Sequence, residues 1–204
     1  MNRLLHLRTI SHEIPSFTRL LAEYGFESAN IRHLRAQALR QRAVILIEAH
    51  IDQRALYDWR HELESHLQAG GTIVFNGHLA WPLFEEVGLF QVAQGRGMED
   101  LIVERAADHP IFAGVSCDDL SFRRGVAGFY ARGANPPPPG AQLLHRLKKD
   151  GSPIDWVWQR PQGGTLFMHS GNNMWMYHND PTSAARIAPQ LAEWMLAQAA
   201  AIAK

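Results

Sequence analysis

The chain has 204 residues, and its 46% hydrophobic content is enough for one substantial core. Twenty Lys and Arg residues balance twenty Asp and Glu residues, which argues against binding to nucleic acid or to an anionic membrane surface. The single cysteine excludes an internal disulfide framework, and no apolar stretch approaches the roughly 20 residues that a membrane helix needs. The short apolar segment at the N-terminus is not typical of a signal peptide. We therefore expect one cytoplasmic domain, spanning residues 1–204, with no nucleic-acid or membrane partner.

The first forty residues have the pattern of strand, helix and strand. Leu4 to Ile10 is apolar enough for a strand, and the apolar spacing from Phe17 to Tyr24 predicts a helix that ends at Gly25. Asn30 to Leu34 alternates weakly, which favours an edge strand.

The central part of the chain predicts a second strand, helix and strand unit. Ala43 to Ala49 is a buried strand, and Thr72 to Phe75 is another. Between them a helix begins near Asp52 and ends at Gly70, with an apolar stripe of Leu56, Trp59, Leu63 and Leu67. Because such units are nearly always right-handed with parallel strands, we expect an α/β fold with a doubly wound, mostly parallel sheet.

The pattern changes after Gly88. Short strand candidates with turns between them predict a β-rich insertion over approximately residues 89–162, followed by one further strand and a C-terminal helix. The candidates are residues 89–92, 101–105, 126–132, 142–147, 154–159 and 165–169. The four prolines at positions 136–139 predict an exposed extended loop.

Three segments carry a resemblance to a known family. They are the helix end and strand LQAGGTIVFNGH, the phrase from Asp108 to Val115, and the late segment GGTLFMHSGNN. Together they resemble the class I glutamine amidotransferase-like superfamily, in particular its trehalose-utilisation-like branch without the catalytic cysteine. The resemblance implies a flavodoxin-like sheet with its site at the carboxyl ends of the strands.

The residues at the implied site depart from an active amidotransferase. The turn after the second central strand reads Asn76-Gly77-His78, so it has no nucleophile, and Gly171 stands where a glutamate would follow the late histidine, His169. Glutaminase activity is therefore not expected. Cys117 lies in a different segment, and we interpret it as a small partly buried hydrophobe rather than a nucleophile.

Several histidines follow predicted strands, and parallel strands would bring them to one edge of the sheet. The predicted ligand-binding residues are His12, His50, Asn76, His78, His169 and Asn172. Of these, His78 and His169 are the candidates for acid–base catalysis. A divalent metal ion is an alternative to a site without a cofactor, held by His50, His78 and His169 with a carboxylate from Glu13, Glu48 or Asp52. The simpler interpretation is that these side chains satisfy backbone groups at strand ends.

The mixture of histidine, amide and aromatic side chains suits a sugar-like or amide-bearing ligand. Trp156, Trp158 and Trp175 could line such a pocket, although core positions are more typical of tryptophans on short strands. The leading hypothesis is an amidotransferase-like domain that binds a small polar molecule or a protein partner. The alternative is a metal- or histidine-dependent hydrolase of a sugar or amide substrate. The sequence is compatible with a homo-oligomer and does not decide whether the protein is an enzyme.

Overall fold

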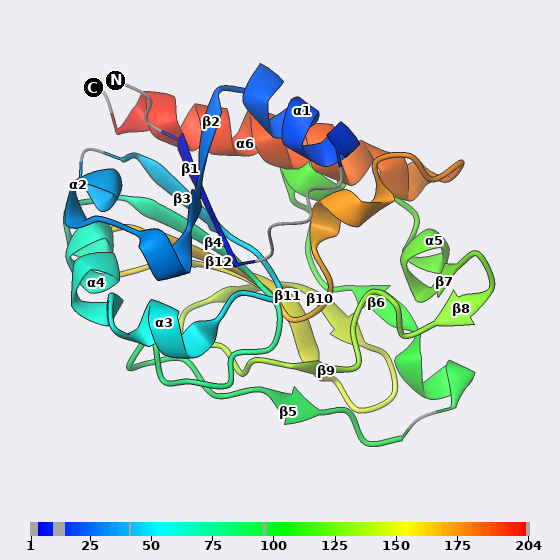
Figure 1. Ribbon diagram of the computed structural model, residues 1–204. Helices are drawn as coiled ribbons and strands as arrows, with labels where there is room; N and C mark the ends of the chain where they lie inside the picture. Colours follow the sequence, from blue (N-terminus) through cyan, green and yellow to red (C-terminus); the bar gives the residue numbers. More distant parts are fainter. Residues whose placement is uncertain (1–3, 10–14, 41, 96, 203–204) are drawn as a thin grey trace.

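The computed structural model describes residues 4–9, 15–40, 42–95 and 97–202, and its centre is an eight-stranded sheet (Figure 1). The strand order is β2-β1-β3-β4-β12-β11-β10-β6. The parallel strands are β1 (Leu4–Arg8), β2 (Phe26–Asn30), β3 (Val44–Ile47), β4 (Thr72–Asn76) and β12 (Thr165–His169). The sheet continues in antiparallel fashion through β11 (Pro153–Gln159), β10 (Gln142–Leu147) and β6 (Val103–Arg105). The fold is therefore α/β with a large, mostly parallel sheet, as expected.

Helices cover both faces of the sheet. The helices α1 (Pro15–Glu23) and α6 (Ile187–Ala201) lie on one face, while α3 (Gln53–Tyr57) and α4 (Arg60–Gln68) lie on the other with α2 (Ala36–Leu39) (Figure 1). Successive side chains of a strand point to opposite faces, so β3 contributes Val44 and Leu46 to one core and Ile45 and Ile47 to the other. This explains why the central strands are continuous apolar runs.

The predicted central unit is confirmed, with one difference in its helix. β3 and β4 pair in parallel, and the segment between them is helical. The expected single helix is two, because Trp59 leaves helical geometry with φ −99° and ψ 10°. There the side chain of Arg60 donates to the carbonyl of Tyr57 and lies over its ring.

The predicted edge strand over Asn30 to Leu34 is misplaced. The edge strand is β2, which ends at Asn30, and the next residues form the 3-10 helix η1 (Ile31–His33). The side chain of Asn30 accepts a hydrogen bond from the amide of Arg32, which turns the chain at this point.

The second half contains mainly short elements. β5 (Gln91–Val92) pairs with β9 (Gly133–Ala134), and β7 (Phe122–Arg123) pairs with β8 (Val126–Ala127). The other elements are α5 (Cys117–Ser121) and the 3-10 helices η2 (Met98–Leu101), η3 (Pro110–Phe112), η4 (Met174–Tyr177) and η5 (Ser183–Arg186).

The proline-rich loop is less exposed than expected. Asn135, just before the prolines, is fully buried, and Pro138 is also buried. Backbone and side-chain groups of Asn135 bond to the sheet edge, so the loop is part of the packed structure. Among the described residues, none of the helices has the length and apolar character that crossing a bilayer requires.

Candidate functional site

Three neighbouring parallel strands end at one edge of the sheet and carry most of the predicted site residues there. His50 follows β3, His78 follows β4, and His169 is the last residue of β12, paired with Asn76. The structure therefore places these residues at one edge. His12, and Glu13 beside it, lie outside the described residues.

The turn after β4 has a backbone that requires glycine. Gly77 has φ +110°, and a Cβ at this position would lie 2.6 Å from the carbonyl oxygen of Ala49. The amide of Gly77 donates to the carbonyl of His169 at 2.8 Å. The tight turn leaves the next residue, His78, exposed at the edge of the sheet.

Two side chains from distant parts of the chain hold this turn. Asn135 donates to the carbonyl of Gly77 and accepts from the amide of Leu79, both at 2.9 Å. Gln53 donates to the carbonyl of His78 at 2.5 Å and accepts from the amide of Ala80 at 2.8 Å. The position of His78 is thus fixed from both sides.

Three hollows meet at His78, and we call them together the His78 cleft. The first has a volume of about 330 Å³ and includes the polar side chains of His50, Gln53, His78 and Asn172, together with Ala49, Ile51, Gly77 and Gly171. The second, of about 260 Å³, is lined by His78, Val126, Gly128, Phe129, Tyr130, Ala131, Arg132, Gly171 and Asn172. The third, of about 610 Å³, is lined mainly by apolar residues, namely Phe90, Val92, Met98, Leu101, Val126 and Ala127, with His78, Gly95, Gly125 and Arg132.

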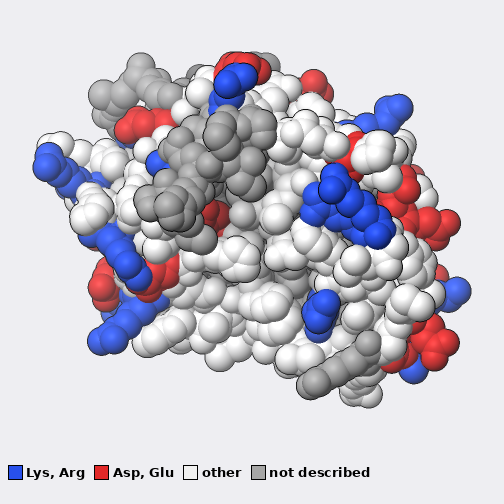
Figure 2. Space-filling view, turned by 45° about the vertical axis from the view of Figure 1, so that its right-hand side comes forward, with Lys and Arg blue, Asp and Glu red and all other residues white. Residues whose placement is uncertain are grey.

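The surface near the apolar hollow has little charge. Figure 2, in which the side carrying β5, β7, β8 and β9 comes forward, shows few charged side chains across the middle of this face. Val92, Met98 and Val126 are 66%, 65% and 53% exposed, which is high for large apolar residues. This part of the cleft is suited to contact with an apolar group.

The imidazole of His78 stacks on the ring of Phe90, with 3.7 Å between ring centroids. Partial burial lowers the pKa of His78, and the nearby rings of His169 and His50 lower it further because a second positive charge is unfavourable. His78 is therefore neutral near pH 7, with one nitrogen able to donate and the other able to accept a hydrogen bond.

The other predicted ligand-binding residues differ in their access to the cleft. Asn172 lines two of the hollows, and its amide nitrogen donates to the carbonyl of Phe129 at 2.8 Å. Asn76 is fully buried, and its side chain bonds to the backbone of Ile47 and Met174. His169 is also fully buried. Asn76 and His169 are thus placed to support the edge rather than to contact a ligand.

His169 belongs to a buried polar cluster that the sequence analysis missed. Asp155 of β11 accepts from Tyr130 at 2.7 Å and contacts Nδ1 of His145 at 2.9 Å and Nδ1 of His169 at 2.6 Å. All four side chains are buried. Burial raises the pKa of Asp155, but the two imidazoles outweigh it and hold that pKa well below its usual value. The sequence feature that could have indicated this cluster is Asp155, a single carboxylate within the otherwise apolar strand segment 154–158.

Several other candidates have structural roles. Trp156, Trp158 and Trp175 are nearly or fully buried and lie in the core. The carboxylate of Glu48 accepts from the amide of Thr9, and Asp52 caps α3. Within the described ranges, no group of three His, Cys, Asp or Glu side chains is arranged to hold a metal ion.

The comparisons with known proteins bear on the fold. No family model matches the chain, and no curated protein matches it. Solved structures do match, among them one described as the mmIFT52 N-terminal domain, with a TM-score of 0.56 and 16% sequence identity over 94% of this chain and 96% of that chain. At this identity the likeness concerns the fold alone. The expected resemblance to the class I glutamine amidotransferase-like superfamily and its trehalose-utilisation-like branch is wrong, since a solved structure that this chain matches over nearly its whole length is described as an IFT52 N-terminal domain.

Proposed function

We propose that this domain binds a small molecule in the His78 cleft, at the carboxyl ends of β3, β4 and β12. The observation that supports this most strongly is the exposed, neutral imidazole of His78 at the point where three hollows meet. Ligands of open α/β sheets commonly bind at this edge. A ligand that contacts His78 there would not disturb the packed sheet.

The lining of the cleft suggests the chemistry of the ligand. His50, His78 and Asn172 offer imidazole and amide groups at one end, whereas Phe90, Val92 and Met98 offer apolar surface at the other. A molecule with a hydroxyl- or amide-rich part and an apolar part fits this division. The ligand class is therefore a sugar derivative, a nucleoside or an amide with an apolar substituent.

A histidine-dependent hydrolase is the second candidate. It is supported by a neutral His78 that could act as an acid or base near pH 7. His169 could act only through His78, because its own ring is buried against Asp155. Metal analysis of protein purified without a histidine tag tests the metal-dependent form of this candidate.

We also propose a flavodoxin-like fold and a cytoplasmic location for this protein. The order β2-β1-β3-β4-β12 of the parallel strands supports a flavodoxin-like, doubly wound arrangement. The free thiol of Cys117 is compatible with the cytoplasmic location inferred from composition.

Ligand-observed NMR tests the binding proposal. A library of monosaccharides, nucleosides and aryl amides is screened by saturation transfer against the wild type, His78→Ala and His61→Ala. His61 is the matched control because it is exposed and lines a different cavity, of about 470 Å³. Binders should lose about tenfold in affinity, or ~1.4 kcal/mol, in His78→Ala and keep it in His61→Ala. Equal losses in both variants, or no loss in either, would contradict the site.

A further inference from the structure

Arg132 gives the His78 cleft a positive charge that no carboxylate in the lining balances. Among the described residues that line the three hollows, Arg132 is the one with a permanent charge, and none is Asp or Glu. Arg132 lines both the apolar hollow and the hollow of about 260 Å³, and these two hollows also share His78 and Val126. The cation therefore lies where two of the hollows meet.

The side chain of Arg132 is held at this boundary by the backbone. Its Nε donates to the carbonyl of Gly128 at 3.1 Å. Gly128 has φ +72°, and a Cβ there would lie 3.2 Å from Cγ and Nε of Arg132 and 2.6 Å from Cδ1 of Leu101. Gly128 lines one hollow and Leu101 lines the other. The glycine thus leaves room for the Arg132 side chain between them.

The guanidinium of Arg132 keeps donors for a further partner. Its Nε is used by Gly128, and within the described ranges no hydrogen bond or ion pair joins its Nη atoms to the protein. The carboxylate of Asp100 lies behind Gly95 but has other partners, because it accepts from the amide of Gly97 at 3.0 Å and pairs with Lys149. The residue is exposed, so a ligand in the cleft can reach these donors.

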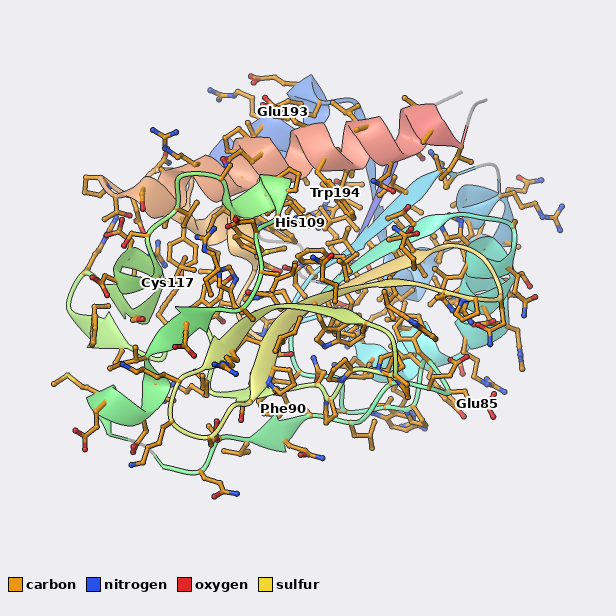
Figure 3. The ribbon with its side chains drawn as sticks, turned by 180° about the vertical axis from the view of Figure 1, so that it is seen from behind. Glu85, Phe90, His109, Cys117, Glu193 and Trp194 are labelled. Carbon is orange, nitrogen blue, oxygen red and sulfur yellow. The ribbon has the colours of Figure 1, made fainter. Side chains whose placement is uncertain are left out.

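The imidazole beside it suits the same kind of ligand. His78 lines all three hollows and is neutral near pH 7, so it can donate a hydrogen bond. Its ring stacks on Phe90. Figure 3 shows Phe90 on the β5 and β9 side of the molecule, with the labelled acidic residue Glu85 well to one side in this view. Two donors next to apolar surface, without a carboxylate in the lining, favour an oxyanion.

We propose that the His78 cleft selects ligands that carry an oxyanion, either a phosphate or a carboxylate, and that Arg132 determines this specificity. The inference rests on the proposed function, because it adds a charge to the ligand expected at the same site. The planar guanidinium matches the paired oxygens of either group. The ligand is then a sugar phosphate, a nucleotide or a carboxylate with an apolar substituent.

The surroundings of Arg132 decide how much its charge contributes. An ion pair fully exposed to water contributes little. Arg132 instead shares its hollow with Leu101, Val126 and Ala127, whose apolar surface reduces screening by water when a ligand covers it. Hydrogen bonds between charged groups are also stronger than neutral ones. Removal of the charge should therefore weaken the binding of an anionic ligand by about tenfold, and that of a neutral ligand far less.

Matched ligand pairs test this specificity. Dissociation constants are measured by ligand-observed NMR for adenosine against adenosine 5′-monophosphate and for 2-naphthamide against 2-naphthoate. The proteins are the wild type, Arg132→Gln and Arg35→Gln. Arg35 is the matched control because it is exposed at the start of α2, outside the lining of the three hollows, and its substitution removes the same charge. Circular dichroism verifies folding of both variants.

The wild type should bind the anionic member of at least one pair about tenfold more tightly than its neutral partner. Arg132→Gln should remove most of this preference, and Arg35→Gln should retain it. A preference confined to the monophosphate identifies phosphate as the oxyanion, and one confined to the naphthoate identifies carboxylate. The preference should also fall as NaCl rises from about 0.05 M to about 0.5 M, because salt screens the charge of Arg132.

Four results overturn the inference. They are equal affinity for both members of each pair, an anion preference that persists in Arg132→Gln, an equal loss for neutral and anionic members in Arg132→Gln, and no binding by any of the four compounds. The first leaves the proposed function standing when the neutral members bind and His78→Ala weakens them. After the last, the wider neutral library decides the proposed function separately.

Discussion

Two histidines at the same sheet edge have opposite environments. His78 is exposed on a glycine turn and lines all three hollows, whereas His169 is sealed against Asp155. The same side chain therefore has two roles, because the ring of His78 meets solvent and the ring of His169 contacts the buried carboxylate of Asp155. This difference makes His78 the residue on which the binding proposal depends.

A buried histidine of β1 predicts how stability depends on pH. Burial lowers the pKa of His6 to about 3, with the charge of Arg8 adding to the effect. Between pH 6.5 and 3 the unfolded chain binds a proton that the folded chain does not, so stability falls as the pH falls through this window. The cost is about 1.4 kcal/mol per pH unit for this group.

Urea unfolding at several pH values measures this slope. His6→Gln should reduce the slope between pH 6.5 and 4.5, and His61→Gln, which changes an exposed ring, should leave it unchanged. The slope is the readout because the His6 substitution can also shift stability at every pH. An unaltered slope in His6→Gln would show that the ring is not neutral in the fold.

Local patterns explain what could be predicted of the elements. The strands at 44–47 and 72–76 and the final strand at 165–169 were visible because each is a short buried apolar run. The break between α3 and α4 was not visible, because the helical spacing of Leu56, Trp59 and Leu63 continues through it. The resemblance to the amidotransferase-like superfamily failed because its motifs are short and common. A Gly-Gly pair between a helix and a buried strand, for example, occurs in unrelated families.

Long-range contacts explain what could not be predicted of the site. Asn135 lies 58 positions from Gly77 and yet holds its turn, and Asp155 contacts side chains of three separate segments. The local sequence around Asn135 indicates an exposed proline-rich loop and not such a role, because four prolines follow it directly. The edge was predictable from the βαβ pattern, but the residues that hold it were not.

The contacts of Asn135 predict a cost for its removal. Asn135→Ala leaves the buried carbonyl of Gly77 and the buried amide of Leu79 without their partners, which should destabilise the fold by about 2 kcal/mol. Urea unfolding measures this loss of stability. The control is Gln68→Ala, a substitution at an exposed helix position. A loss of unfolding free energy no larger than that of the control would mean that the hydrogen bonds of Asn135 do not stabilise the turn.

The eight-stranded sheet joins strands from both halves of the chain. β6, β10 and β11 come from the chain after Gly88, and they extend the sheet from β12, which pairs with β4. Separating the two halves would expose paired strands and divide both cores. The topology therefore ties the β-rich segment to the parallel strands.

Cooperative unfolding follows from this topology. Circular dichroism and tryptophan fluorescence should report one coincident urea transition, and limited proteolysis near Gly88 should not release two folded halves. Two separated transitions, or a stable fragment that ends near Gly88, would show that the segments fold independently.

Chemical-shift mapping of a confirmed binder in the ¹H–¹⁵N spectrum tests the central claim most directly. The His78 cleft predicts that the largest changes occur at the amides of Gly77, His78, Gly171 and Asn172, which lie together at the carboxyl edge. The contradicting result would be changes centred on the cavity at the other end of the sheet, at Leu39, His61, Ser65 and Gly71.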